Sequence, residues 1–494
     1  MSIDHALWVH GHSAEIEYPD RVASIVQKGY CVRVQGNPST TNWLHFAVPT
    51  AVIVDDSRMR PLSILFRYKA DGGGSVEAVH VYDGERKIAT DESPTGTVDS
   101  DGWTLIKVGV NLDEILSVEW GIGISIKLRF GREGGQLEFE SAGCDFEFAN
   151  RVGPQRLQIY TKKAPMEFPY HSSLPIDVPN EAIERIVISL HGTGANADLY
   201  LSNGLAATKA AADTGVDNRA MDNTLIIAPQ FINTIEYCRK FAPNILHWNG
   251  GRASSSESVE RDLDGDGVPD SGTLSSFTVM DTLLERVCRR SLFPNLRIVV
   301  IAGHSNGGRF MARYAAASRF EQEVATPRDI HVRYLVMGSG SYLYMDERRQ
   351  VFEDDTYLTA AHSDDWRNTI VNLEDFSTVC DEGADRFNNW PWGLNDLWPY
   401  PVQVGAEQIR NQFGSRDVHY LVGERDLSAS FTFCQERVQG RDTLAKTLLY
   451  YRHLEHFYEA GLRHHLQVVP NVGHSGRGEM TSPQGLAALF GPVT

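Results

Sequence analysis

The segment from Ile298 to Gly308 constrains the fold of this chain more than any other stretch. Its sequence, Ile-Val-Val-Ile-Ala-Gly-His-Ser-Asn-Gly-Gly, is an apolar run that enters a glycine-rich turn, and an alternating apolar run begins at Phe310. This pattern predicts a buried strand, a tight turn and a helix. Glycines leave room on both sides of Ser305, so we expect a strained serine whose hydroxyl is exposed above a sheet. An ordinary glycine-rich turn is the structural alternative.

Strand-like and helix-like segments alternate around this turn from about residue 183 to residue 494. Helix-like patterns cover 199–214, 276–290 and 441–460. Buried strand-like runs begin at Arg185, Thr224, Ile298, Val332, Val418 and His465. Alternation of this kind over about 300 residues predicts a doubly wound, mostly parallel sheet.

In residues 1–150 the apolar residues recur with a different period. Short runs in which apolar and polar residues alternate are separated by Gly, Asp, Asn and Pro, and no clear helix pattern occurs. This predicts an all-β domain of the sandwich or jelly-roll type, with Trp8, Trp43 and Trp103 expected in its core. The proline-rich residues 151–182 are expected to form a linker and the first strands of the second domain, residues 183–494.

Length and charge narrow the class of protein. A chain of 494 residues is too long for one core. The net charge of −18 argues against nucleic acid and anionic membrane as partners, and no apolar run is long enough to span a bilayer. No signal peptide is visible at the N-terminus, so a cytoplasmic protein is expected, or a secreted one if a leader was removed. The oligomeric state cannot be predicted.

The six cysteines show no Cys-x-x-Cys spacing, so a zinc ribbon or a dithiol redox site is not expected. Cys380 and Cys434 lie in the same late region and are the pair to test for a disulfide. Isolated buried thiols are the simpler interpretation.

A nucleophilic serine needs a base that accepts its proton and an acid that orients this base. His474 follows the last predicted strand and has small neighbours on both sides, which favours it as the base; a histidine in a surface loop is the alternative. Asp426 follows the penultimate strand and is the candidate acid. Glu424 is its nearest rival, and Asp417 is a weaker one because it precedes that strand. An Asp426 that merely caps a helix before Ser428 is the structural alternative.

The same chemistry needs N–H donors for a developing oxyanion. The turn Leu190-His-Gly-Thr-Gly194 follows an early predicted strand. We expect the backbone N–H groups of Thr193 and of Asn306, the residue after the serine, to be these donors.

These four segments resemble those of the α/β-hydrolase superfamily in type and in chain order. His-Gly-x-Gly resembles the oxyanion loop of lipases and esterases, and Gly303-His-Ser-Asn-Gly-Gly308 resembles the elbow of a largely uncharacterised set of microbial and fungal hydrolases. The final Gly-Gly also resembles polyester depolymerases and feruloyl esterases. Where that microbial set has Asn-Pro-Ser-Ser-Tyr, this chain has Gly338-Ser-Gly-Ser-Tyr. The segments 42–50 and 79–85 resemble an uncharacterised bacterial β-sandwich module, which implies no activity.

The segment 262–270, Asp-Leu-Asp-Gly-Asp-Gly-Val-Pro-Asp, has the spacing of a calcium loop. Asp262, Asp264 and Asp266 occupy positions one, three and five, and Asp270 occupies position nine. Position twelve is Thr273 rather than Glu, so the segment resembles the Asp-rich loops of dockerins and thrombospondin repeats more than a full EF-hand. We expect a structural Ca²⁺ here; a solvated acidic loop is the alternative.

A long insertion covers about residues 341–415 and is rich in tryptophan, and inserts at this place commonly form caps over a site. Its indole rings are expected to line a pocket for an apolar acyl group, or else to pack the core of the cap. The tryptophans are Trp366, Trp390, Trp392 and Trp398.

The resemblance and the site residues together imply a serine hydrolase that cleaves carboxylic esters through an acyl-enzyme, without a cofactor for catalysis. The substrate would be a small or a polymeric ester, including polyester and feruloyl types. The same triad would also serve an amidase, a peptidase or a lactonase. A non-catalytic protein whose β-sandwich binds glycan or polymer is the alternative from another class.

Overall fold

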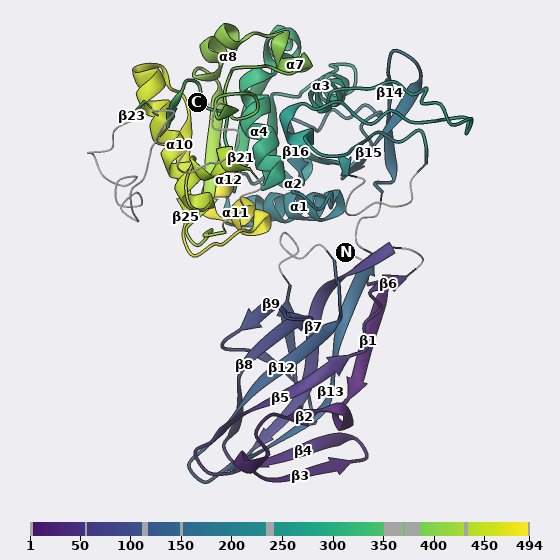
Figure 1. The fold of residues 1–494 in the computed structure, drawn as a ribbon, viewed down its shortest axis with the longest axis vertical. Helices are drawn as coiled ribbons and strands as arrows, with labels where there is room; N and C mark the ends of the chain where they lie inside the picture. The colour runs from purple at the N-terminus through teal and green to yellow at the C-terminus, as the bar shows by residue number, and fades with distance from the viewer. Residues whose placement is uncertain are drawn as a thin grey trace. The chain divides into compact units, whose positions relative to one another are not determined.

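The computed structural model describes residues 3–54, 57–110, 117–148, 152–233, 242–349, 369–370, 386–428 and 433–492. The chain divides into two compact units, Met1–Ala149 and Asn150–Thr494, here called the N-terminal and the C-terminal unit. Each is described by itself (Figure 1).

The N-terminal unit consists of two antiparallel sheets. The order of the second sheet is β2-β5-β12-β8-β9, and that of the first is β10-β11-β7-β13-β4-β3, with β1 paired to β13 and β6 to β7. The first sheet comprises β1 (His5–His10), β3 (Val22–Lys28), β4 (Cys31–Gly36), β6 (Ile53–Val54), β7 (Ser57–Asp71), β10 (Gly96–Val98), β11 (Thr104–Gly109) and β13 (Gly135–Phe148). The second comprises β2 (Glu15–Ile16), β5 (Thr41–Val48), β8 (Gly74–Asp83), β9 (Arg86–Asp91) and β12 (Ile122–Phe130).

One hydrophobic core is shared by these two sheets. Alternate residues of β12 are buried, as the period of a strand requires. Phe46 from the second sheet meets Phe139 from the first, with ring centroids 6.3 Å apart. The predicted core positions of three tryptophans are wrong. Trp8 is 41% exposed and Trp43 and Trp103 are half-buried, because all three lie at positions that alternate with the core residues of their strands or flank them.

The C-terminal unit is organised around an eight-stranded sheet of order β14-β15-β17-β16-β20-β21-β24-β25. The pairs β14–β15 and β15–β17 are antiparallel, and every later pair along this order is parallel. The strands are β14 (Gln155–Tyr160), β15 (Pro165–Ser172), β16 (Arg185–Leu190), β17 (Thr224–Pro229), β20 (Ile298–His304), β21 (His331–Met337), β24 (Asp417–Gly423) and β25 (His465–Val469). Short ribbons pair β18 (Ile232–Asn233) with β19 (His247–Trp248) and β22 (Arg348–Arg349) with β23 (Thr369–Ile370).

Helices cover both faces of this sheet (Figure 1). On β20, Val299 and Ile301 belong to one core and Val300 and Ala302 to the other. The first core is completed by α3 (Ser276–Val287), α4 (Asn306–Ala317), α8 (Ala406–Phe413) and α10 (Thr443–Tyr458). The second is completed by α1 (Ala197–Thr214), α11 (Gly476–Thr481) and α12 (Pro483–Phe490). The remaining short helices are α2 (Ala220–Asn223), α7 (Pro399–Val402) and α9 (Cys434–Arg437).

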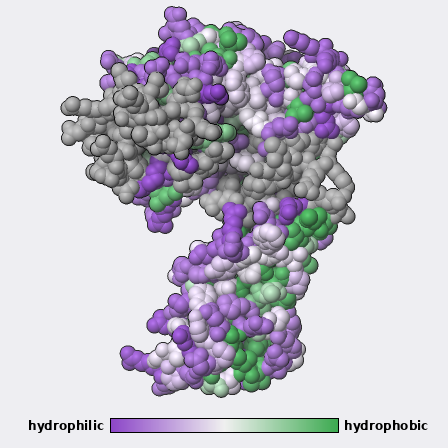
Figure 2. Space-filling view, in the orientation of Figure 1, coloured by the Kyte–Doolittle hydropathy of each residue, from purple (hydrophilic) through white to green (hydrophobic). Residues whose placement is uncertain are grey.

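Hydrophilic residues cover most of the described surface on the face that Figure 2 shows, and hydrophobic residues form separate groups on it. Among the described residues, no helix has both the length and the apolar character that a membrane crossing requires. Cys31, Cys144 and Cys288 are buried free thiols. Cys380 and Trp366 lie outside the described residues, as does the side chain of Cys434.

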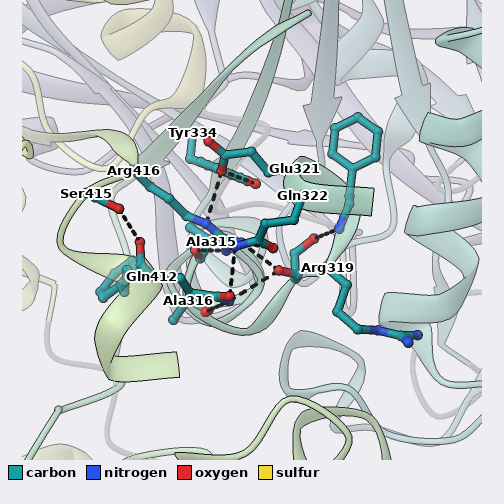
Figure 3. A network of polar contacts seen from close by, with 12 residues as sticks. Ala315, Ala316, Arg319, Glu321, Gln322, Tyr334, Gln412, Ser415 and Arg416 are labelled. Atoms are coloured by element: carbon teal, nitrogen blue, oxygen red, sulfur yellow. Dashed lines mark hydrogen bonds and ion pairs between the residues drawn. The ribbon is translucent and has the colours of Figure 1, made fainter. Parts of the chain in front are cut away.

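A buried polar network holds the C-terminal end of α4. Figure 3 shows the side chains of Arg416 and Gln412 directed at the carbonyl groups of Ala315 and Ala316. These carbonyls lie in the last turn of a helix, where no intrahelical donor is available. Arg416 is buried, and its Nε lies 3.0 Å from the carboxylate of Glu321. The network therefore fixes the helix whose opposite end carries Ser305.

Replacing Arg416 with alanine is expected to destabilise the C-terminal unit by about 3 kcal/mol, because Glu321 loses its cationic partner and the carbonyl of Ala315 loses its donor. Calorimetry should place the unfolding transition of this unit lower by about 5 °C. Arg452 is the matched control, since it pairs with Glu455 at the surface of α10. Its replacement should cost at most about 0.5 kcal/mol. Equal effects of the two substitutions would contradict the role given to the network.

Candidate active site

Ser305 lies between the end of β20 and the first residue of α4, in a backbone conformation that few residues adopt. Its φ is 58° and its ψ is −117°, a combination that costs about 1–3 kcal/mol in a residue other than glycine. The amide of Ser305 donates to the carbonyl of Met337 on β21 at 3.0 Å, and its carbonyl accepts the amide of Arg309 at 2.9 Å. The turn is thus anchored on both sides.

Glycines allow the turn at Ser305 to pack closely against the Leu190–Gly194 turn. A Cβ on Gly307 would lie 2.5 Å from the carbonyl oxygen of Leu190, and a Cβ on Gly303 would lie 2.2 Å from that of Gly307. The Leu190–Gly194 turn follows β16, which pairs with β20. A Cβ on Gly192 would lie 3.3 Å from the Cβ of Ser305. The structure therefore brings the predicted oxyanion loop against the predicted nucleophile.

The loop that carries Thr193 is held from beneath by two buried side chains. His191 bonds the carbonyl of Gly192 through Nδ1 at 2.7 Å and accepts the amide of Phe231 at Nε2 at 2.9 Å. Gln230 donates to the carbonyl of Ala195 at 2.9 Å. Neither His191 nor Gln230 was given a role from the sequence, because only tertiary contacts reveal what they support.

Asp426 and His474 form a hydrogen-bonded pair, with 2.7 Å between Oδ2 and Nδ1. The Asp426 side chain is fully buried, and that of His474 is 14% exposed. Burial raises the pKa of Asp426, but the hydrogen bond from His474, its charge and the hydroxyl of Ser428 outweigh burial and lower this pKa below its ordinary value. The carboxylate is therefore ionised at neutral pH.

The two rival acids lie elsewhere. Glu424 is exposed, and its carboxylate accepts the backbone amide of Asn471 at 2.8 Å. Asp417 opens β24 and so lies at the opposite end of the strand from Asp426, where it accepts hydrogen bonds from His331, Arg333 and His419. Of these three carboxylates, that of Asp426 is the one hydrogen-bonded to His474 in the described part of the chain.

His304, the residue before Ser305, connects the turn to His474. The rings of His304 and His474 lie 4.5 Å apart, and Nδ1 of His304 is hydrogen-bonded to the hydroxyl of Tyr200 on α1 at 2.8 Å. Burial, and next the charge of His474, lower the pKa of His304 well below its ordinary value, although Asp426 acts in the opposite direction. A neutral His304 packs against His474 without repelling a proton on it. The sequence offered His304 only as the variable residue of a motif.

Thr193 and Asn306 both line a pocket of about 140 Å³. Asn306 is the first residue of α4, where an amide has no acceptor within the helix. The other described lining residues include apolar rings from Trp392 and Phe433, whose centroids are 5.4 Å apart. They also include an ion pair of 2.7 Å between Arg309 and the buried Glu436.

The tryptophans of the insertion divide between the two predicted roles. Trp392 lines this pocket. Trp390 is buried in the larger core and donates to the carbonyl of Ser254 at 2.7 Å, and Trp398 packs against the same core.

The acidic loop brings together three of its four predicted ligands. Carboxylate oxygens of Asp262, Asp264 and Asp266 lie within 4.8 Å of one another. The fourth, Asp270, accepts the amide of Leu263 at 3.1 Å. Backbone amides of Gly265 and Gly267 donate to Asp262 and lower its pKa, so its carboxylate is ionised at neutral pH. Three carboxylates at this spacing suit a hard cation such as Ca²⁺.

Comparison with protein families gives a match in the N-terminal unit. A family of unknown function (DUF6623) matches residues 2–133. No curated protein matches the chain.

Solved structures overlap with about two thirds of the chain at low identity. Poly(aspartic acid) hydrolase-1 from Sphingomonas sp. KT-1 is 16% identical, with 67% of this chain and 96% of that chain covered and a TM-score of 0.38. The poly(3-hydroxybutyrate) depolymerase LpqC from Bordetella parapertussis is 17% identical, with 70% and 92% covered and a TM-score of 0.41. The siderophore hydrolase EstB from Aspergillus nidulans is 14% identical, with 70% and 98% covered and a TM-score of 0.31.

Proposed function

We propose that this protein is a serine hydrolase of the α/β-hydrolase type that cleaves carboxylic esters through an acyl-enzyme. The observation that carries the proposal is the 2.7 Å hydrogen bond between buried Asp426 and His474, because the ring of His474 packs on the residue that precedes the strained Ser305. A base that a buried acid orients beside a half-buried serine is the arrangement that nucleophilic catalysis requires.

In the first half of the reaction, Oγ of Ser305 attacks the ester carbonyl. Since Nδ1 of His474 faces Asp426, Nε2 is the nitrogen that takes the serine proton, and Asp426 stabilises the resulting imidazolium. The carbonyl oxygen becomes an oxyanion, which the N–H groups of Thr193 and Asn306 stabilise. The C–O bond to the alcohol then breaks, and the alcohol leaves with the proton from His474.

In the second half, water replaces the alcohol. His474 takes a proton from water as the water oxygen attacks the acyl carbon, and the same donors stabilise the second oxyanion. The bond to Oγ of Ser305 breaks, Oγ recovers its proton from His474, and the acid is released. No cofactor takes part in this proposal.

The pocket at Thr193 and Asn306 suggests which esters fit. A volume of about 140 Å³ holds about five water-sized groups, which corresponds to a short acyl chain. The rings of Trp392 and Phe433 provide an apolar wall, and Arg309 with Glu436 a polar one. A polyester or feruloyl substrate would therefore place one ester in the site and most of its length outside this pocket.

A series of p-nitrophenyl esters tests the proposal. The wild-type protein should hydrolyse these esters, and kcat/KM should stop rising with acyl length at about the butanoate, because a methylene that the pocket cannot bury adds none of the about 0.8 kcal/mol that burial would contribute. If the protein hydrolyses none of these esters, the proposal is refuted. Parallel assays with p-nitroanilides, lactones, polyester films and feruloylated sugars distinguish an esterase from an amidase, a peptidase or a lactonase.

We also propose that the acidic loop at Asp262, Asp264 and Asp266 binds a structural Ca²⁺. Its three clustered carboxylates would repel one another without a cation. The ion would hold the segment between β19 and α3 and would take no part in the chemistry.

Calcium in excess over its Kd is expected to raise the melting temperature of the C-terminal unit by a few degrees relative to EDTA, because binding at 100 times Kd stabilises by about 2.7 kcal/mol. The double variant Asp264→Asn, Asp266→Asn should melt at one temperature in both conditions. Identical melting of the wild-type protein in Ca²⁺ and in EDTA would contradict the assignment.

A further inference from the structure

A groove crosses the outer face of the second sheet of the N-terminal unit, and none of its lining residues has been given a functional role above. Its volume is about 540 Å³. We call it the Trp120 groove and define it by Ala47, Tyr82, Trp120, Gly123 and Ser125, which are among its lining residues.

The floor of the Trp120 groove is hollow because its central residues are small. Gly123 on β12 pairs with Ala47 on β5 and with Tyr82 on β8. A Cβ on Gly123 would meet no atom within 4 Å. The depression therefore lies where Gly123 and Ala47 leave the surface of the sheet low beside the ring of Tyr82.

An aromatic band borders this floor along β8. His80 and Tyr82 have ring centroids 6.4 Å apart, and Trp43 from β5 lies 4.9 Å from His80. Gly84 continues the row, and Trp120 lies over it, with its Cδ1 2.9 Å from the place of a Cβ on Gly84. Residues two apart on a strand share a face, so these rings all open to the same side.

Trp120 is 77% exposed, yet its backbone is rigidly held. Asp83 is buried and accepts three backbone amides in succession, those of Glu119, Trp120 and Gly121, at 2.7, 2.8 and 2.8 Å. Charge-assisted bonds of this kind are strong. An exposed indole on a preorganised turn loses little entropy when a ligand stacks on it.

The side chains that line the Trp120 groove distinguish between charged, apolar and neutral polar ligands. None of the described lining residues is Asp, Glu, Lys or Arg, although the whole chain carries a net charge of −18. This lining favours an uncharged ligand. His45, whose Nδ1 bonds Ser125 at 2.9 Å, the hydroxyl of Ser125 and Tyr82 line the floor and wall. An apolar polymer would bury the hydroxyl of Tyr82 without offering it a hydrogen bond, which costs free energy.

We propose that the Trp120 groove binds a neutral carbohydrate chain. A sugar ring has C–H faces that stack on indole and phenol rings and an edge of hydroxyls that can hydrogen-bond the hydroxyl groups of Ser125 and Tyr82. The proposal does not depend on the function assigned to Ser305.

Depletion binding of the full-length protein to cellulose, chitin and insoluble xylan tests this proposal, followed by calorimetric titration with the matching hexasaccharide. Wild-type protein should be retained by at least one of the three. Trp120→Ala and Gly123→Leu should each weaken binding at least about tenfold, the first by removing the stacking surface and the second by filling the floor.

Two matched substitutions control for general surface effects. Tyr160→Ala removes a ring that is 76% exposed on the C-terminal unit, and Gly109→Leu adds the same side chain to an exposed strand glycine of the first sheet, where a Cβ would also meet nothing. Both should bind like the wild type. Three results would overturn the proposal: retention by none of the polysaccharides, unchanged binding of Trp120→Ala, or retention only by poly(3-hydroxybutyrate) granules. Dissociation of a dimer by Trp120→Ala in sedimentation velocity would assign the groove to a contact between copies instead.

Discussion

Replacing Ser305 with alanine is expected to lower kcat for p-nitrophenyl butanoate by about 10⁵-fold or more, because no other oxygen then lies where the acyl group must be attached. The loss should appear in kcat rather than KM, since the pocket walls and the oxyanion donors remain. Stopped-flow measurement should also lose any burst of p-nitrophenol, because the burst reports the acyl-enzyme.

Two further variants separate chemistry from folding. Ser305→Gly should be equally inactive and more stable by about 1 kcal/mol, because glycine adopts a φ of 58° without the strain that serine bears. Ser415→Ala removes a hydroxyl that donates to the carbonyl of Gln412 at 3.0 Å, and should keep wild-type activity. Turnover by Ser305→Ala within about tenfold of wild type would refute the assignment of the nucleophile.

The positions of helices and strands in the C-terminal unit could be predicted because apolar residues recur there with the period of each element. The predicted helix 441–460 corresponds to α10, Thr443–Tyr458. Its start differs because Asp442 accepts the amide of Ala445 at 2.8 Å and thereby caps the helix. The helix predicted over 276–290 ends earlier, at Val287, where the amide of Cys288 makes the last bond to Leu284. The two-residue strands β18, β19, β22 and β23 could not be predicted, since so short a segment has no period.

The errors in the N-terminal unit have one cause. Trp8, Trp43 and Trp103 were placed in the core because tryptophan is large and apolar, but position along a strand decides which face a residue occupies. The residues next to Trp43 in the sequence, Asn42 and Leu44, are both buried. Strand alternation therefore directs Trp43 outward, where it joins the aromatic band of the Trp120 groove.

The sequence could predict which loops carry the residues of the candidate site, but it could not predict which side chains contact one another. Carboxyl ends of parallel strands share one edge of a sheet, so Ser305, Asp426 and His474 could be assigned to the same edge from strand order alone. Which carboxylate meets His474 depends on a few ångströms of loop geometry. The roles of Tyr200, His304 and Ser428 depend on packing between α1, β20 and the loop after β24, which no local pattern contains.

Asp426→Asn is expected to lower kcat by about 10³–10⁴-fold with little change in KM, because an amide can stabilise neither the required tautomer of His474 nor its imidazolium. The structure makes this loss large, since the Asp426 side chain is fully buried and no water can replace the carboxylate. Its lowered pKa also keeps it charged at neutral pH.

Glu424→Gln is the matched control for this substitution, because it makes the same carboxylate-to-amide change two residues earlier and at an exposed position. It should retain kcat within about twofold, since Gln can still accept the amide of Asn471. The pH profile adds an independent measurement. In the wild type the acid limb reports His474, whose charged form Asp426 favours, so Asp426→Asn should move that limb to lower pH. A large loss in Glu424→Gln with a small loss in Asp426→Asn would assign the acid to Glu424 and place the hydrogen bond at His474 outside the mechanism.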